Sequence, residues 1–271
     1  MVKCIRGFKS HSLRKSFFHK KEAMKNQEVS VILTSYNKPT YLKKAIDSVL
    51  SQTYDDVHLI IAEDNSPDLE VYNVIKNAVN CNSTKKKITF FNSFVKDEDR
   101  FKTARYATQI NTAVRTYSNS KYICYLADDD FYYPDMIQEM INSAEEHNHD
   151  AVFCAQHVLD EDGNIDGGGL DGRGVRWFDD PLERGADKLD HNQVMTTRSL
   201  FDIVNGWEDH PHSWSGADAY FFDRIEKKGF KFYPIDCKKP LQGKVYRQKS
   251  VQWNIVNGYL PNGDTKQGEN K

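Results

Sequence analysis

The stretch Tyr122-Ile-Cys-Tyr-Leu-Ala-Asp128-Asp129-Asp130-Phe-Tyr-Tyr-Pro134-Asp decides the fold. Its first six residues are apolar or β-favouring and predict a buried strand over 122–127. Three carboxylates follow at once, and Pro134 opens a helix with apolar residues on one face: Met136, Ile137, Met140 and Ile141. Acids at the carboxyl end of a strand lie where open α/β sheets bind ligands. Because they repel one another, either a divalent cation shares them or they form a solvated turn that caps the helix.

The rest of the chain alternates in the same way. Strands are expected at 29–33, 57–62, 88–91, 151–155 and 230–235, and amphipathic helices at 39–52, 69–79, 103–117, 197–204 and 217–228. Strands alternating with helices of roughly 10 to 15 residues predict a doubly wound, mostly parallel sheet with helices on both faces. Residues 158–165 predict a hairpin. Residues 166–190 contain glycine clusters and predict a long loop, which serves as a lid, a binding loop or a disordered segment.

Composition excludes several classes of protein. The 271 residues carry a formal net charge of −2, which argues against a nucleic-acid binder. The 5 cysteines are odd in number and lack CxxC spacing, so neither a disulfide framework nor a zinc site is predicted. This use of cysteine predicts a reducing, cytoplasmic compartment. No apolar run approaches the roughly 20 residues that span a bilayer, and no secretory signal is expected.

The N-terminal residues differ from the rest. We expect a basic appendage at 1–27, the main domain at 28–250 and a polar tail at 251–271. The first 26 residues hold eight basic residues against one acid, with phenylalanines interleaved at nearly helical spacing. Such a segment indicates peripheral contact with the anionic inner face of a membrane, or a helix that packs on the domain or on a second subunit.

Several motifs resemble those of family 2 glycosyltransferases. Val29-Ser-Val-Ile-Leu-Thr-Ser-Tyr-Asn37 is similar to the opening strand of that family, and Ala45-Ile-Asp-Ser-Val-Leu-Ser-Gln-Thr-Tyr54 to the helix after it. Ile60-Ile-Ala-Glu-Asp64-Asn-Ser66 resembles the second strand with its acidic end. Asp128-Asp129-Asp130 resembles the metal motif, and the order of the motifs along the chain is also that of the family.

Two further motifs resemble the spore-coat polysaccharide transferases of this family, which have the GT-A fold. These are Arg105-Tyr106-Ala107 and Gly216-Ala217-Asp218-Ala219, the second with one residue inserted. The resemblance covers about 29–251, roughly four-fifths of the chain. It implies the GT-A fold and the transfer of a sugar from a nucleotide-sugar donor, with UDP as the expected nucleotide.

The resemblance also implies donor contacts. The backbone of Thr34 would contact the donor, and the base would stack on Tyr36. Asp64 follows an apolar strand, where a carboxylate can accept the imide N–H of uracil, or it caps the helix that follows. Arg105 opens its helix and suits a base edge or a phosphate, or it pairs with an acid within 97–99.

Hard carboxylate oxygens suit Mg²⁺ or Mn²⁺. By resemblance, Asp129 is the direct metal ligand and Asp128 contacts the ribose. Asp130 is a second candidate ligand, although the spore-coat relative has asparagine there. The cation would neutralise the charge that develops on the departing diphosphate.

Asp218 is the candidate general base. It precedes Phe221, Phe222 and Ile225 at helical spacing, so its carboxylate is expected on the apolar, inward face of the first turn. Carboxylates seldom lie there without a partner or a purpose, although an ordinary N-terminal helix acid is the alternative. The resemblance implies that Asp218 takes the proton from the acceptor hydroxyl as the general base. It also implies that the anomeric configuration of the transferred sugar is inverted. Asp190-His191 also matches a pair in the spore-coat relative, and His191 either binds a sugar or is structural.

These residues together predict an inverting, metal-dependent glycosyltransferase. Its acceptor would be a saccharide or a lipid-linked saccharide in bacterial surface polysaccharide synthesis. A sugar nucleotidyltransferase shares the fold class, but usually has a glycine-rich loop where this chain has Thr34-Ser-Tyr-Asn-Lys38-Pro39. A non-catalytic sugar- or polyanion-binding module would need neither Asp129 nor Asp218.

Overall fold

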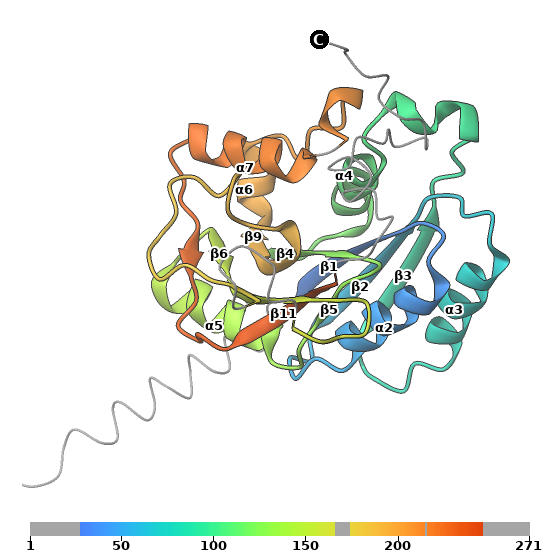
Figure 1. The fold of residues 1–271 in the computed structure, drawn as a ribbon, viewed down its shortest axis with the longest axis horizontal. Helices are drawn as coiled ribbons and strands as arrows, with labels where there is room; N and C mark the ends of the chain where they lie inside the picture. Colours follow the sequence, from blue (N-terminus) through green and yellow to red (C-terminus); the bar gives the residue numbers. More distant parts are fainter. Residues whose placement is uncertain (1–27, 166–173, 215, 246–271) are drawn as a thin grey trace, which may run out of the picture.

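The computed structural model describes residues 28–165, 174–214 and 216–245, which are built around one large sheet (Figure 1). In spatial order its strands are β10 (Tyr233–Pro234), β6 (Ala151–Phe153), β9 (Val194–Thr197), β4 (Tyr122–Ala127), β1 (Val29–Ser35), β2 (Val57–Glu63) and β3 (Lys87–Asn92). Neighbouring strands pair in parallel, except that β9 is antiparallel to both β4 and β6. The mostly parallel sheet is therefore confirmed, with one antiparallel strand that was not predicted.

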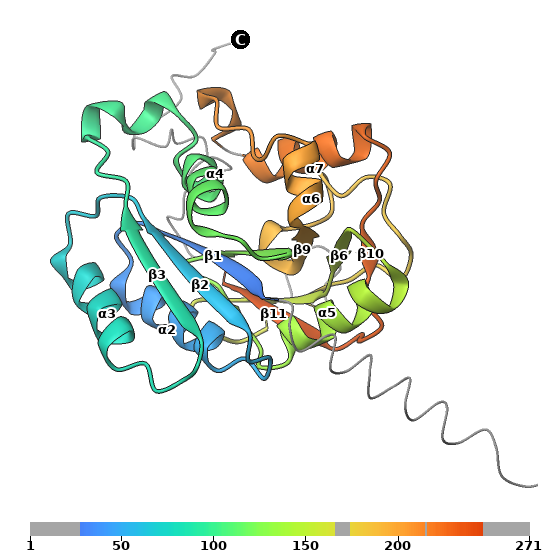
Figure 2. The ribbon, with the colours of Figure 1, turned by 180° about the vertical axis from the view of Figure 1, so that it is seen from behind.

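Helices cover both faces of this sheet (Figures 1 and 2). One face carries α2 (Pro39–Leu50), α3 (Leu69–Asn80) and α5 (Met136–His147), and the other α4 (Arg105–Tyr117), α6 (Arg198–Ile203) and α7 (Ala217–Lys227). Strand β1 is buried on both sides: Val31 and Leu33 join the core under α2, while Ile32 joins the core under α4. This explains its continuous apolar sequence.

The predicted strand at 151–155 is wrong in one respect, because it is two strands. It divides at Cys154, where β6 ends and β7 (Ala155–Leu159) leaves the main sheet. A smaller sheet then forms in the order β5 (Phe131–Tyr132), β11 (Pro240–Val245), β7 and β8 (Val175–Arg176). This second sheet brings the last described strand, β11, next to the acidic turn after β4.

Other boundaries differ by a few residues. The helix predicted from 103 begins at Arg105, after the 3-10 helix η1 (Asp97–Lys102). The helix predicted from 197 begins at Arg198, because Thr197 ends β9 and its hydroxyl accepts the N–H of Leu200. The strand predicted at 230–235 is reduced to β10. A bridge between Leu159 and Ile165 confirms the hairpin, and two short 3-10 helices complete the described part: η2 (His191–Gln193) and η3 (Pro211–Ser213).

Several expectations fall outside the described residues. They concern the basic segment 1–26, the glycine-rich residues 166–173 and the tail 251–271. Within the part of the chain that the structure describes, no helix is long and apolar enough to cross a membrane.

Burial of His58 in β2 makes the stability of the fold depend on pH. Burial and the nearby Lys87 lower the pKa of His58 from 6.5 to about 4, against a smaller opposing effect of Glu28. In the unfolded chain His58 therefore becomes protonated below about pH 6.5, whereas in the folded chain it stays neutral until the pH reaches about 4. We expect this histidine to remove up to about 3 kcal/mol of stability as the pH falls through that window.

Chemical denaturation of the wild type and His58→Gln at several pH values checks this prediction. The loss of stability between pH 6.5 and 4 should be smaller in the variant, while the two curves should run parallel above pH 7. Equal slopes in acid would show that His58 titrates normally in the folded protein.

Candidate functional site

The candidate donor side of the site lies at the carboxyl ends of β1 and β2, where Asp64 is buried between two arginines. Arg100 donates from Nη1 to Oδ2 at 2.6 Å, and Arg105 donates from Nη2 to Oδ1 at 2.7 Å. Ser93 adds a hydroxyl to Oδ1 at 2.8 Å. Asp64 does not cap α3, whose N-cap is Asp68. Among the described residues, Arg105 pairs with Asp64 and not with the acids at 97–99.

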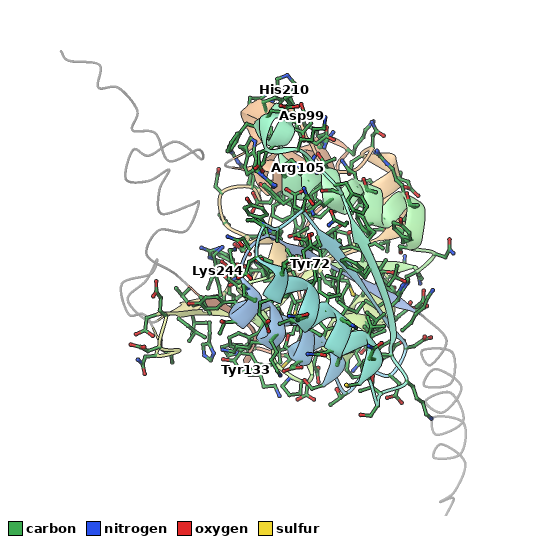
Figure 3. The ribbon with its side chains drawn as sticks, turned by 90° about the vertical axis from the view of Figure 1, so that its right-hand side faces the viewer. Tyr72, Asp99, Arg105, Tyr133, His210 and Lys244 are labelled. Carbon is green, nitrogen blue, oxygen red and sulfur yellow. The ribbon has the colours of Figure 1, made fainter. Side chains whose placement is uncertain are left out.

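The turn that carries Asp64 is fixed by its neighbour Glu63. The buried Glu63 carboxylate accepts the backbone N–H groups of Asn65 and Ser66 at 2.9 and 2.8 Å. It also accepts the hydroxyl of Tyr72 from α3 at 2.9 Å; Tyr72 is labelled in Figure 3. Because several donors hold this one side chain, the turn keeps a single geometry and Asp64 keeps its place beside α4.

Tyr36 links this arginine pair to the acidic turn. Its backbone N–H donates to Asp128 Oδ2 at 2.8 Å, and its ring, 38% exposed, lies under the guanidinium of Arg100 at 4.1 Å. Thr34 precedes it in β1 and pairs with Ala62 of β2 and Ala127 of β4. The predicted donor residues therefore come together along adjacent strand ends.

Asp128 and Asp129 meet on one cation, the ammonium group of Lys38. Its Nζ lies 2.7 Å from Asp128 Oδ1 and 2.9 Å from Asp129 Oδ2. Burial and the charge of Asp129 raise the pKa of Asp128, and Lys38 opposes this. The carboxylates do not cap α5, whose N-cap is Asp135. Their arrangement indicates a site for positive charge.

Asp130 faces the other way. Its Oδ2 accepts the side-chain amide of Asn192, and its Oδ1 accepts the backbone N–H of Val245, both at 2.8 Å. Burial, with the charge of Asp129, raises the pKa of Asp130 to about 8. Both of its oxygens are thus engaged by protein N–H groups.

Beneath the acidic turn lies a buried polar network. Asn192 also accepts the N–H of Ala127 at 2.7 Å and donates to Asp190, which forms an ion pair with Lys244 of β11. Figure 3 labels Lys244 of this network and Arg105 of the candidate donor side. Burial alone would raise the pKa of Asp190, but the positive groups of Lys244, His191 and Arg176 lower it far below its ordinary value.

The candidate base Asp218 lies in the first turn of α7, half-buried as predicted, next to His191. Its Oδ2 is 3.5 Å from His191 Nδ1, and its Oδ1 accepts the N–H of Ala219 at 2.9 Å. Burial tends to lower the pKa of His191, but the nearby carboxylates of Asp218 and Asp190 raise it above its ordinary value. The two carboxylates therefore stabilise the protonated form of the imidazole.

Aromatic rings support this pair from behind. The Trp207 ring meets His191 edge-on at 5.6 Å and stacks on Phe221 of α7 at 5.0 Å. Trp207 is in turn held by Asn111 of α4, which accepts its N–H and donates to its carbonyl at 2.8 and 2.9 Å. The position of the candidate base therefore depends on the packing of α4, Trp207 and α7 against one another.

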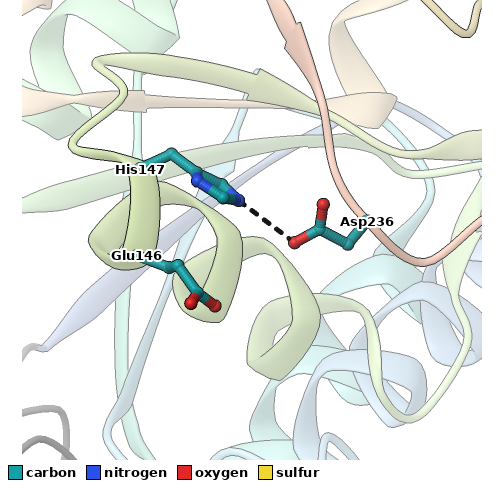
Figure 4. A group of neighbouring side chains, drawn as sticks. All are labelled: Glu146, His147 and Asp236. Atoms are coloured by element: carbon teal, nitrogen blue, oxygen red, sulfur yellow. Dashed lines mark hydrogen bonds and ion pairs between the residues drawn. The ribbon is translucent and has the colours of Figure 1, made fainter.

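Two groups of described side chains could hold a metal ion. In the first, one ligand atom each from Asp190, His191 and Asp218 lie within 4.8 Å of one another. The second is Glu146, His147 and Asp236 near the end of α5, where His147 contacts Asp236 at 3.3 Å (Figure 4). All three members of the second group are exposed, and we assign no role to it.

Four residues of the site were not identified from the sequence. Lys38 directly follows the opening motif and Asn192 follows Asp190-His191, so proximity to a motif could have pointed to both. Arg100 and Lys244 lie outside every motif. Arg100 meets Asp64, and Lys244 meets Asp190, only once the chain has folded.

With this geometry described, known proteins can be compared. The family model described as Glycosyl transferase family 2 matches residues 30–201. The chain belongs to glycosyl transferase family 2. The family predicted from the motifs is therefore confirmed.

Two relatives come from Bacillus subtilis. Protein CgeD is 37% identical over 209 residues, which cover 73% of this chain and 46% of that protein. The putative glycosyltransferase EpsE is 23% identical over 241 residues, which cover 86% of this chain and 80% of that protein. The chain thus spans less than half the length of CgeD.

Solved structures share the fold at low identity. TarS of S. aureus, solved in complex with UDP-GlcNAc, has a TM-score of 0.60 at 15% identity, over 83% of this chain and 60% of that one. The mannosyltransferase PcManGT from Pyrobaculum calidifontis, solved with GDP-Man and Mn²⁺, has a TM-score of 0.62 at 12% identity, over 91% and 69%. These likenesses show that the predicted GT-A fold is correct.

Gly206, next to Trp207, gives a test of how tightly this support is packed. Gly206 and Gly229 both follow a helix with positive φ, 70° and 84°. A Cβ at Gly206 would collide with Asn111 Oδ1 and the Phe201 ring, whereas nothing lies within 4 Å of one at Gly229. We expect Gly229→Ala to cost about 1 to 2 kcal/mol for the left-handed backbone, and Gly206→Ala roughly 1 to 3 kcal/mol more for crowding.

The free energies of unfolding of both variants check this prediction. Because the backbone strain is matched, their difference reports on crowding against Asn111, Phe201 and Arg115. Equal losses of unfolding free energy in the two variants would mean that the side chains packed around Gly206 and Trp207 can move aside without destabilising the protein.

Proposed function

We propose that the chain is an inverting, metal-dependent glycosyltransferase that moves a sugar from a UDP-sugar to a hydroxyl group of an acceptor. The observation that carries this proposal is the meeting of Asp128 and Asp129 on the ammonium group of Lys38, at 2.7 and 2.9 Å. This pair lies at the carboxyl ends of parallel strands and next to Tyr36. A charged site beside an aromatic ring suits a nucleoside diphosphate, which has a planar base at one end and an anionic group at the other.

Tyr36 and Asp64 are the proposed base contacts, with Arg105 beside them and the backbone of Thr34 below. The exposed Tyr36 ring offers a stacking surface, and Asp64 can accept the imide N–H of uracil. A nucleotide-sugar donor is supported by two structural neighbours, TarS in complex with UDP-GlcNAc and PcManGT in complex with GDP-Man. The choice of UDP rests on the motif resemblance.

The acidic turn fits a divalent cation, because Lys38 already shows that two carboxylates converge on one positive charge. Asp129 would be the direct ligand of Mn²⁺ or Mg²⁺, with Asp128 nearest the ribose. We propose a scaffold role for Asp130, since both of its oxygens accept protein N–H groups. When bound, the cation would neutralise charge on the departing diphosphate. PcManGT, a structural neighbour, was solved with Mn²⁺.

Asp218 is the proposed general base. Its side chain is 25% exposed, so an acceptor hydroxyl can approach it, while His191 Nδ1 lies 3.5 Å from Oδ2. Asp218 would take the hydroxyl proton as that oxygen attacks the anomeric carbon from the face opposite the diphosphate, which inverts the configuration. A direct contact of His191 with a sugar stays a prediction.

A panel of labelled UDP- and GDP-sugars, offered with saccharide acceptors and with or without metal, tests the proposal as a whole. Transfer of the sugar to an acceptor supports it. Formation of a sugar nucleotide from a nucleoside triphosphate would favour a nucleotidyltransferase, and binding without turnover would favour a sugar-binding module. The resemblance to spore-coat polysaccharide transferases supports a saccharide acceptor in a bacterial surface polymer.

The metal assignment predicts how UDP changes thermal stability. UDP should raise the Tm modestly in EDTA and clearly more with Mn²⁺ or Mg²⁺, because the cation joins the diphosphate to the protein. Asp129→Ala should remove only the metal-dependent part, whereas Asp162→Ala, in the exposed hairpin turn, should behave as the wild type. Identical shifts with and without metal would contradict a metal-bridged diphosphate.

The base assignment predicts a loss of turnover without a loss of donor binding. Asp218→Asn keeps the size of the side chain but removes its basicity, so turnover should fall by roughly 10² to 10⁴. UDP affinity should not change. Asp223→Asn, on the same helix and paired with Lys227, is the matched control. Wild-type turnover in Asp218→Asn, or a product of retained configuration, would show the assignment to be wrong.

A further inference from the structure

The guanidinium group of Arg100 lies between the two proposed base contacts. It is stacked on the Tyr36 ring, 4.1 Å from its centroid, and it donates to Asp64 Oδ2 at 2.6 Å. A planar group on Tyr36 that gives an N–H to Asp64 makes the same two contacts that we propose for the base. Arg100 thus imitates the base in shape and in hydrogen bonding.

Asp64 has little capacity left for a ligand while Arg100 is in place. A carboxylate offers about four acceptor positions, and Oδ1 already receives Ser93 and two N–H groups of Arg105. Oδ2 receives Arg100 and, at 3.3 Å, Nε of Arg105, and the whole side chain is 4% exposed. A base can reach this carboxylate only after one of its donors leaves.

Arg100 is the donor best suited to leave. Its Nε and Nη2 are buried without a hydrogen-bond partner among the described residues, although Nη2 lies 3.5 Å from the exposed carboxylate of Asp97 in a looser ion pair. Buried donors without acceptors oppose this position of the side chain. Arg100 Nη1 also donates to the backbone carbonyl of Asp64 at 3.0 Å. Arg105 makes the larger set of hydrogen bonds, to both carboxylate oxygens of Asp64 and to Thr103, from the first turn of α4.

We infer that Arg100 occupies the base subsite of the free protein and that the nucleotide base must displace it in order to bind. This inference rests on the proposed function, because it takes Tyr36 and Asp64 as the base contacts. Arg100 belongs to the short 3-10 helix η1, and its hydrogen bond to Asp64 ties this helix to the turn after β2. Displacement would therefore carry a change in η1 with it.

The displacement predicts that removing Arg100 strengthens nucleotide binding. A binding-competent form that is only partly populated weakens the apparent affinity by that fraction, so Arg100→Ala should bind UDP roughly 3- to 10-fold more tightly. Asp64 keeps Arg105 and Ser93 as partners in this variant. Calorimetry with UDP and Mn²⁺ measures the effect. Pyrophosphate with Mn²⁺ should bind both proteins equally, since it has no base.

Two matched variants control the experiment. Lys102→Ala, an exposed neighbour in η1, should leave UDP affinity unchanged, and Arg105→Ala should weaken it. If Arg100→Ala binds UDP equally or more weakly than the wild type, Arg100 does not compete with the base, and the inference is overturned while the proposed function stands. If the wild type and the variant bind no nucleotide, both are overturned.

Hydrogen exchange on the wild type gives a second test that does not depend on a variant. UDP with Mn²⁺ should speed exchange at the amides of η1 as Arg100 leaves Asp64, while the amides after β2 become protected. Protection of η1, or no change there, would overturn the displacement and would instead make Arg100 part of the bound site.

Discussion

The geometry of the acidic turn depends on one amide side chain, that of Asn192. It accepts the N–H of Ala127 at 2.7 Å, and it donates to Asp130 at 2.8 Å and to Asp190. Only an amide can accept from the end of β4 and donate to two acids at the same time. Because a half-satisfied buried network is costly, this arrangement turns Asp130 inward and leaves Asp129 on the side of Lys38.

Five carboxyl groups lie in this small region, and each has a partner in the fold. Asp130 accepts N–H groups from Asn192 and Val245, Asp190 pairs with Lys244, the acids at 128 and 129 share Lys38, and Asp218 faces His191. Burying a charge without a partner would cost several kcal/mol. The fold therefore places a basic or hydrogen-bonding group against every one of these acids.

Local patterns were enough to predict the central part of the fold. Buried parallel strands such as β1 and β4 carry continuous apolar runs, and their helices carry regular apolar faces, so nearby residues determine them. Strand β9 and the small sheet depend on pairings between distant segments, which leave little local signal. The same limit applies to the site: Asp64 was identified from its motif, but its partner Arg100 is 36 residues away and lies outside every motif.

The register of β1 fixes the spacing between the base side and the charged side of the site. Strand β1 pairs with β2 through Ser35 and Glu63, and with β4 through Thr34 and Ala127. Tyr36, the residue after the end of β1, donates its backbone N–H to Asp128 Oδ2 at 2.8 Å. Since strand pairing in a buried sheet cannot slip without moving apolar side chains out of the core, this spacing is rigid. Loops around the edge can therefore change without altering the distance between the proposed base contacts and the proposed metal ligand.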